Sequence, residues 1–142
     1  MIPPSDDDRI LNALLTSQRL AVLATSGGDV PHASLMAFAR DPETGRLIFA
    51  TAQDSRKYRN LRENPLVALL IDNRRNRSAD FREAAAVTIR GRAKELEGSE
   101  RAEALDVYLE RHPDLAAFAP SEGTALFAVT VTETEVIGRF QE

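Results

Sequence analysis

The stretch Arg46-Leu47-Ile48-Phe49-Ala50-Thr51-Ala52-Gln53-Asp54-Ser55-Arg56-Lys57 joins a short apolar run to a polar turn that carries two hydroxyls and two cations. The run from Arg46 to Thr51 follows turn residues and is rich in strand-forming side chains, which predicts a strand. Helical spacing then continues from the turn until Asn64-Pro65 stops it, so Ser55 stands at the expected N-cap. The segment therefore predicts a strand, a tight turn and a helix.

The start of that helix suits an anion. Free backbone N–H groups and the positive end of the helix dipole favour negative charge there. Arg56 and Lys57 add formal charge, and each charge-assisted hydrogen bond contributes roughly 1.5–3 kcal/mol. Together with the hydroxyls of Thr51 and Ser55 they form a set suited to a phosphate. An ordinary serine N-cap followed by a solvated basic turn explains the same residues equally well at this point.

The composition is that of one globular domain spanning residues 1–142. Hydrophobic residues make up 43% and charged residues 28%, with a net charge of −4, which argues against a general nucleic-acid binder. Cysteine is absent, which excludes disulfides, thiolate metal sites and cysteine nucleophiles. The N-terminal Met1–Asp8 is acidic where a signal peptide needs positive charge, and no apolar run reaches the length of a membrane span. We expect a cytoplasmic protein without membrane or nucleic-acid partners.

The rest of the chain predicts two more helices and five more strands, mostly joined as hairpins. The run 66–71 is apolar throughout, which favours a strand buried on both faces, whereas 85–94 alternates between apolar and polar residues. We therefore expect a mainly β fold, a six-stranded antiparallel barrel with three flanking helices, or alternatively an open α+β sandwich. The expected helices are 6–18, 55–64 and 98–111, and the expected strands are 20–25, 30–40, 46–51, 66–71, 85–94 and 124–132, with Val136–Phe140 as an extension or a tail.

No catalytic residue or metal site can be assigned from the pattern. His32 and His112 are far apart and have no partner at metal-ligand spacing. His112 precedes Pro113 at a predicted helix end, where it suits the terminal carbonyls. His32 shares a strand face with Ser34, where bonding to the backbone competes with an approach to a ligand. Because nucleophile-elbow and Walker motifs are also absent, a bound cofactor should carry the chemistry.

An arginine-rich loop follows the fourth expected strand. A solvated charged loop is the usual interpretation of such a sequence. The functional alternative is a loop that crosses a subunit boundary and contacts the ligand of the partner. Its charged residues are Arg74, Arg75, Arg77 and Arg82, set against Asp72, Asp80 and Glu83.

Several motifs in fixed order resemble the pyridoxamine 5′-phosphate oxidase-like flavoproteins, which have the FMN-binding split barrel. The resemblance begins with the strand Leu20–Thr25 and continues through Pro31-His32-Ala33-Ser34-Leu35-Met36. Phe49-x-Thr51, Ser55-Arg56-Lys57 and Asn64-Pro65 follow at the spacing of the family. The resemblance covers nearly the whole chain, and the ordered set is more specific than any one of its parts.

The resemblance implies an FMN site at the interface of a homodimer. Residues matching the phosphate and ribityl contacts of the family are Thr51, Ser55, Arg56 and Lys57; those matching strands along the flavin ring are Ser34, Leu35, Met36, Ala37, Phe49 and Ala50. The loop from Asn73 to Phe81, with Asn73 and Arg74 as candidate contacts, is expected to reach the flavin of the partner subunit.

Departures from the family pattern argue against pyridoxamine phosphate oxidation itself. Where the vitamin-processing enzymes carry an arginine and a lysine on the second strand, this chain has Ala33 or Ser34 and then Phe38 or Ala39. Gly138-Arg139-Phe140 does not replace their C-terminal Arg-x-His motif. We therefore expect an FMN-dependent oxidoreductase that exchanges hydride between the flavin and an unknown small molecule. The alternatives are a non-catalytic flavin-binding or sensing module, and a deazaflavin- or haem-handling split barrel.

Overall fold

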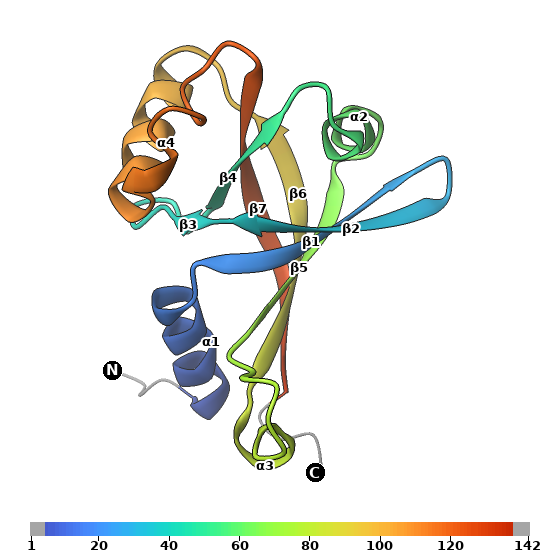
Figure 1. The fold of residues 1–142 in the computed structure, drawn as a ribbon, viewed down its shortest axis with the longest axis vertical. Helices are drawn as coiled ribbons and strands as arrows, with labels where there is room; N and C mark the ends of the chain where they lie inside the picture. The colour runs from blue at the N-terminus through green and yellow to red at the C-terminus, as the bar shows by residue number, and fades with distance from the viewer. Residues whose placement is uncertain (1–4, 138–142) are drawn as a thin grey trace.

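One seven-stranded antiparallel sheet forms the centre of the molecule, which a computed structural model describes for residues 5–137 (Figure 1). Its strands lie in the order β2-β1-β5-β6-β7-β4-β3. The predicted extension Val136–Phe140 lies within the described residues only as far as Ile137. The segment Gly138-Arg139-Phe140 lies outside them. The strands are β1 (Leu20–Gly27), β2 (Val30–Ala37), β3 (Ala39–Arg40), β4 (Leu47–Ala52), β5 (Leu66–Asp72), β6 (Ala86–Glu95) and β7 (Thr124–Ile137). The helices are α1 (Asp6–Ser17), α2 (Arg56–Glu63), α3 (Asp80–Glu83), α4 (Gly98–Arg111) and the 3-10 turn η1 (Pro113–Leu115).

The predicted second strand, 30–40, is in fact two strands that pair with different neighbours. β2 pairs with β1 and β3 pairs with β4, so they lie at opposite edges of the sheet. Only Phe38 separates them along the chain, and its backbone N–H donates to Arg19 O at 3.2 Å. Because consecutive residues join the two edges, the sheet has to curl until those edges meet, which makes a half-barrel. The expectation of six strands was wrong for this reason.

The core fills the inside of the curled sheet. On β6, Val87, Ile89, Gly91 and Ala93 face inward, as the alternating sequence predicts. β4 contributes Leu47 and Phe49 to the same core, and α1 and α2 cover its two open ends with Leu14, Leu15 and Leu61.

α4 packs on the outer side of β3, β4 and β7, and this makes a second, smaller core. No described element covers the outer side of β2, β1 and β5 in the same way. Leu66 and Leu70 of β5 are 57% and 38% exposed, so the prediction that this strand is buried on both faces was wrong. Five apolar side chains project from this uncovered surface, which we call the open face: Leu20, Val22, Leu35, Leu66 and Leu70.

The described chain ends in a longer strand than the pattern predicts. β7 continues past Thr132 because it pairs with β6 as far as Ile137, with an irregularity at Arg90/Gly91. α3 lies within the predicted arginine-rich loop, so the described residues contain four α-helices rather than three. None of these helices has the length and apolar character that crossing a membrane requires.

Candidate functional site

A cavity of about 370 Å³ lies where the curled sheet fails to close, between β2 and β4. Its lining includes Lys57 from the first turn of α2 on one side, and Tyr108 of α4 with Leu115 and Phe118 of the segment after it on the other. Figure 1 shows α2 and α4 on opposite sides of β4. Leu20 and Leu35 of the open face also line the cavity, so it adjoins that face. The lining residues are Leu20, Leu35, Met36, Ala37, Ala50, Thr51, Ala52, Lys57, Tyr108, Leu115 and Phe118.

The two hydroxyls at the turn before α2 are bonded to the chain itself. Ser55 is the N-cap, as predicted, and its Oγ accepts from the Tyr58 N–H at 3.1 Å. The same Oγ donates to Ala52 O at 2.7 Å and lies 3.0 Å from Thr51 Oγ1. A serine hydroxyl has one proton, so Thr51 must be the donor in that pair. In this arrangement neither hydroxyl has a free proton for a phosphate.

Lys57 supplies the cationic charge of the cavity. Its side chain is half-buried, and desolvation lowers the pKa of its ammonium group from the usual 10.5. Among the described residues no carboxylate forms an ion pair with it. Arg56, by contrast, is exposed beside the same turn. A partly buried cation without an anionic partner, at the start of a helix, is suited to a bound anion.

The opposite side of the cavity is apolar and comes from the C-terminal third of the chain. Tyr108 of α4 donates its phenolic O–H to Ala37 O at 3.3 Å, and burial raises its pKa to about 12. The phenol is therefore neutral at ordinary pH. Leu115 and Phe118 complete this wall. These three residues could not be predicted from the sequence, because nothing in the local pattern distinguishes them from ordinary helix and turn residues.

Two of the predicted flavin-strand residues do not line the cavity. Phe49 is completely buried and stacks on Phe127 in the core, with ring centroids 5.4 Å apart. Ser34 lies on the inner face of β2, and its buried hydroxyl has no hydrogen-bond partner among the described residues. An unpaired buried hydroxyl is uncommon and invites a ligand or water as its partner.

The two histidines differ in availability. His112 is 7% exposed, and its Nε2 lies 2.6 Å from Phe38 O at the break between β2 and β3. His112 thus anchors α4 to the sheet. The sequence predicted a different role, in which His112 interacts with the terminal carbonyls of its own helix. His32 is half-buried on β2 beside Thr25 of β1.

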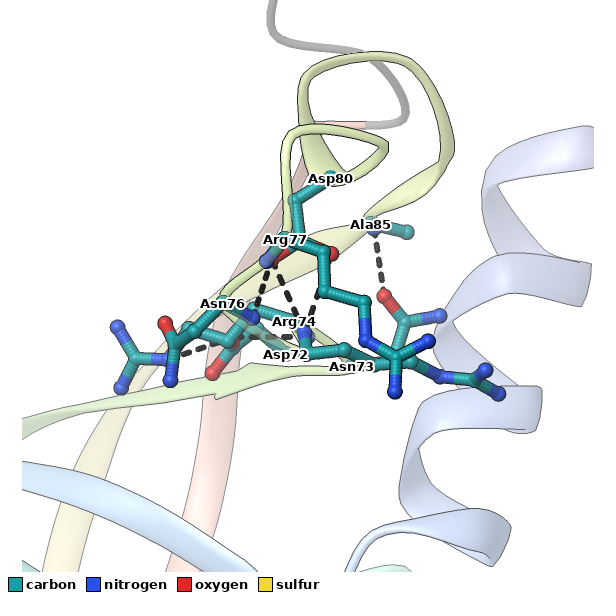
Figure 2. Close-up of polar contacts among 8 residues, drawn as sticks. Asp72, Asn73, Arg74, Asn76, Arg77, Asp80 and Ala85 are labelled. Carbon is teal, nitrogen blue, oxygen red and sulfur yellow. Dashed lines mark hydrogen bonds and ion pairs between the residues drawn. The ribbon is translucent and has the colours of Figure 1, made fainter.

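The loop between β5 and α3 lies at the other end of the sheet from α2 (Figure 1). Figure 2 shows the Asp80 carboxylate holding this loop, where it accepts from the backbone N–H groups of Arg75, Asn76 and Arg77 at 2.7–3.3 Å. These bonds lower the pKa of Asp80, that from Arg75 most.

The two predicted contact residues of this loop are engaged within it. Asn73 Oδ1 accepts from the Ala85 N–H at 2.8 Å, and Arg74 Nε lies 3.2 Å from Asp72 Oδ2 (Figure 2). Within one chain, neither lies at the cavity beside Lys57.

The structure thus gathers half of the predicted site residues around one cavity: Leu35, Met36, Ala37, Ala50, Thr51 and Lys57. They combine a cationic end with apolar walls, which suits a ligand that has an apolar ring part and an anionic group.

Comparison with known proteins gives a consistent family assignment. Residues 8–138 match the family model described as pyridoxamine 5′-phosphate oxidase. None of the curated proteins matches the sequence significantly.

Solved structures share the fold at low sequence identity. The heme binding protein from Mycobacterium smegmatis superimposes with a TM-score of 0.85 at 20% identity, over 100% of this chain and 57% of that one. HutZ, the heme storage protein from Vibrio cholerae, gives a TM-score of 0.78 at 15% identity and covers 94% and 95% of the two chains. A FAD-binding protein from Mesorhizobium loti gives a TM-score of 0.70 at 20% identity, covering 88% and 89%. The chain thus spans little more than half of the mycobacterial protein, and at these identities the likeness establishes the fold alone.

Proposed function

The chain belongs to the pyridoxamine 5′-phosphate oxidase family, and on that basis we propose that it is an FMN-binding flavoprotein that exchanges hydride with a small molecule. The observation that carries the proposal is the half-buried Lys57 at the cavity between β2 and β4, which forms no ion pair among the described residues. A cation in that position is costly unless an anion joins it. The FMN phosphate is such an anion.

The residues that would hold FMN divide into two groups. Lys57, Arg56 and the first N–H groups of α2 would hold the phosphate. Apolar side chains of β2 and β4, with Phe118, would contact the ring. Because the hydroxyls of Thr51 and Ser55 are already hydrogen-bonded within the chain, Ser55 would not contact the phosphate directly. It caps α2 instead, and in this way it orients Arg56 and Lys57. When bound, FMN supplies hydride exchange at its N5 atom.

The cofactor is tested by titrating the purified chain with FMN, riboflavin, a deazaflavin and haem, each followed by absorbance. We expect one FMN per chain, and an affinity for riboflavin lower by roughly ten- to a hundredfold, because riboflavin lacks the phosphate that Lys57 would bind. The absence of FMN binding in this titration would contradict the proposal. A Soret shift with haem instead would favour the activity named for two of the structural neighbours.

The haem alternative has less support from the imidazole groups of this chain. His112 is buried and bonded to Phe38 O, which leaves His32 as the accessible imidazole.

Catalytic turnover is tested separately from cofactor binding. Anaerobic mixing of the FMN complex with NADH or NADPH should bleach the flavin absorbance if the chain is a reductase. A non-catalytic binding module would keep its yellow colour with every donor.

The proposal includes a homodimer with the cavity at its interface. The open face supports it, because Leu35 is 65% exposed and Leu20 is 52% exposed beside the cavity. Apolar surface of this kind commonly marks an interaction site. In such a dimer the Asn73–Phe81 loop would approach the flavin of the partner subunit. Since Asn73 and Arg74 are engaged within the loop, their contact with the flavin remains a prediction.

A further inference from the structure

α2 owes its position to a polar attachment on β1. The helix has eight residues, too few for a stable helix on its own. Its buried side chains are Leu61 and Asn60, the second of which is only 8% exposed. A buried amide is unusual on the core face of so short a helix, where an apolar residue would normally pack. Asn60 therefore calls for a specific explanation.

The partner of Asn60 is a hydroxyl buried in the adjacent strand. Asn60 Nδ2 donates to Thr25 Oγ1 at 3.1 Å, and Thr25 is 3% exposed. The side-chain oxygen of Asn60 occupies the space where a Cβ at Gly27 would lie. Asn60 thus contacts two positions of β1, one through a hydrogen bond and the other through a close approach that requires glycine.

A second bond repeats this attachment one turn later. Asn64, the C-cap of α2, donates from Nδ2 to Ser26 Oγ at 3.0 Å. Three consecutive residues of β1, Thr25 to Gly27, therefore receive the two asparagine side chains of α2. Hydrogen bonds of fixed geometry define the rotation of a helix about its axis more narrowly than apolar contacts, which tolerate sliding.

The rotation of α2 decides where Lys57 lies. Lys57, Asn60 and Asn64 are spaced by three and four residues, so they share one face of the helix. Each residue of helix corresponds to about 100° of rotation. A modest turn of α2 would move Lys57 from the cavity, and Leu61, which lies one turn further along the same face, would move with it.

We propose that Asn60 is a positioning residue for the anion site: its bond to Thr25 and its contact with Gly27 set the rotation of α2 and so direct Lys57 into the cavity. This inference rests on the proposed function, because Lys57 is taken to bind the FMN phosphate. It assigns a role to Thr25, Gly27 and Asn60, none of which lines the cavity. Their effect should appear in the recognition of the phosphate and not of the flavin ring.

The test compares Thr25→Val with Thr25→Ser. Valine matches the shape of threonine but removes the acceptor, whereas serine keeps the hydroxyl. FMN and riboflavin dissociation constants are measured for each by fluorescence titration, and folding is checked by circular dichroism. We expect Thr25→Val to weaken FMN binding about tenfold, with riboflavin binding unchanged, since misplacing one charged hydrogen bond has an effect of this order. Thr25→Ser should keep the ratio of the two constants within about twofold of the wild type.

Asn60→Leu provides a second variant that leaves no unpaired amide if Thr25→Val does not fold. It should lose the preference for FMN while its riboflavin affinity stays at the wild-type value, which a purely structural role would not produce. A folded Asn60→Leu protein with the wild-type ratio overturns the inference and leaves the proposed function intact. A wild-type chain that binds FMN and riboflavin equally overturns both the phosphate role of Lys57 and this inference.

Discussion

The partial burial of the Lys57 ammonium group opposes the stability of the fold. The Lys57 side chain is half-buried, and no carboxylate among the described residues forms an ion pair with it. Desolvation disfavours the charged form, which is why its pKa lies below the usual 10.5. Sites that bind charged ligands commonly retain such a cost because the ligand removes it. Lys57 should therefore have opposite effects on folding and on FMN binding.

Replacing Lys57 with methionine tests this opposition. Lys57→Met should weaken FMN binding by roughly ten- to a hundredfold through the loss of a charge-assisted hydrogen bond, while riboflavin affinity stays unchanged. The melting temperature of the apoprotein should stay equal or rise, because an apolar stem replaces a desolvated cation. Titration and thermal unfolding measure the two effects. Arg59→Met, which removes an exposed charge from the same helix, is the matched control. Equal losses in both variants would mean that general charge, and not Lys57, attracts the phosphate.

The pH dependence of stability in the wild type and in Lys57→Met tests the same effect of Lys57 on folding independently. Between the lowered pKa of folded Lys57 and the 10.5 of the unfolded chain, the unfolded state binds more protons. Stability conferred by this group therefore rises with pH across that window. The melting temperature of the wild type should approach or exceed that of Lys57→Met as the pH rises towards 10.5. FMN affinity should fall over the same window in the wild type alone, because the neutral amine no longer pairs with the phosphate.

At the scale of single elements, the loop from Asn73 to Ala79 shows how one carboxylate orders an exposed segment. Asp80 accepts from three successive backbone N–H groups, of Arg75, Asn76 and Arg77, and Asn76 adopts a left-handed conformation with φ of 61° (Figure 2). This conformation is one that asparagine tolerates better than most residues. Ordered in this way, the loop holds its arginine side chains on a defined backbone.

Asp80→Asn should loosen this loop without unfolding the domain. The amide of asparagine is a weaker acceptor than the carboxylate for three N–H groups, and backbone opening governs proteolysis of exposed loops. Trypsin should therefore cleave after Arg75 or Arg77 about fivefold faster or more. Glu83→Gln is the control, because the Glu83 carboxylate makes no hydrogen bond or ion pair among the described residues. Unchanged cleavage of Asp80→Asn would show that the loop is ordered by other contacts.

The pH dependence of the same loop gives a second measurement. In the wild type, the protection of the loop's backbone amides from hydrogen exchange should persist below pH 3.8, the usual Asp pKa, and be lost as the pH falls through the lowered pKa of Asp80.

Elements defined by neighbouring residues were predicted well, and those defined by distant pairing were not. The strand before Thr51, the cap at Ser55 and the stop at Asn64 all follow from local signals, and all three are confirmed. The break at Phe38 could not be foreseen, because it reflects a change of partner from β1 to β4. Periodicity describes which face a residue takes and not which strand lies beside it.

The candidate site divides in the same way. Its cationic end comes from one contiguous motif, so the sequence reveals Lys57 together with its helix start. Its apolar wall comes from Tyr108 and Phe118, which lie more than fifty positions further along the chain. Only the curling of the sheet brings these parts together, and no local pattern records that. Phe49 was assigned to the ring through the family motif, but its side chain belongs to the core.

For the molecule as a whole, the distribution of apolar surface separates two sides of the half-barrel. α4 covers the outer side of β3, β4 and β7, whereas the open face on β2, β1 and β5 stays uncovered within the described chain. Val22 pairs with Leu35 on one side and with Leu70 on the other, which makes a continuous apolar row across three strands. A continuous apolar row of this kind is typical of a protein interface, whereas isolated apolar residues are common on any protein surface. The homodimer we propose would bury it.

Leu70→Lys is the sharpest test of that dimer, because Leu70 belongs to the open face and does not line the cavity beside Lys57. Burying an unpaired ammonium at an interface costs roughly 3–5 kcal/mol, enough to weaken association more than a hundredfold. We expect the wild type to sediment as two 15.6 kDa chains and Leu70→Lys as one, with FMN affinity falling alongside. Val30→Lys is the control, since Val30 is also apolar and exposed but has the opposite strand parity from Leu35. A dimeric Leu70→Lys protein would place the interface elsewhere, and a monomeric wild type with bound FMN would separate the cofactor site from any dimer.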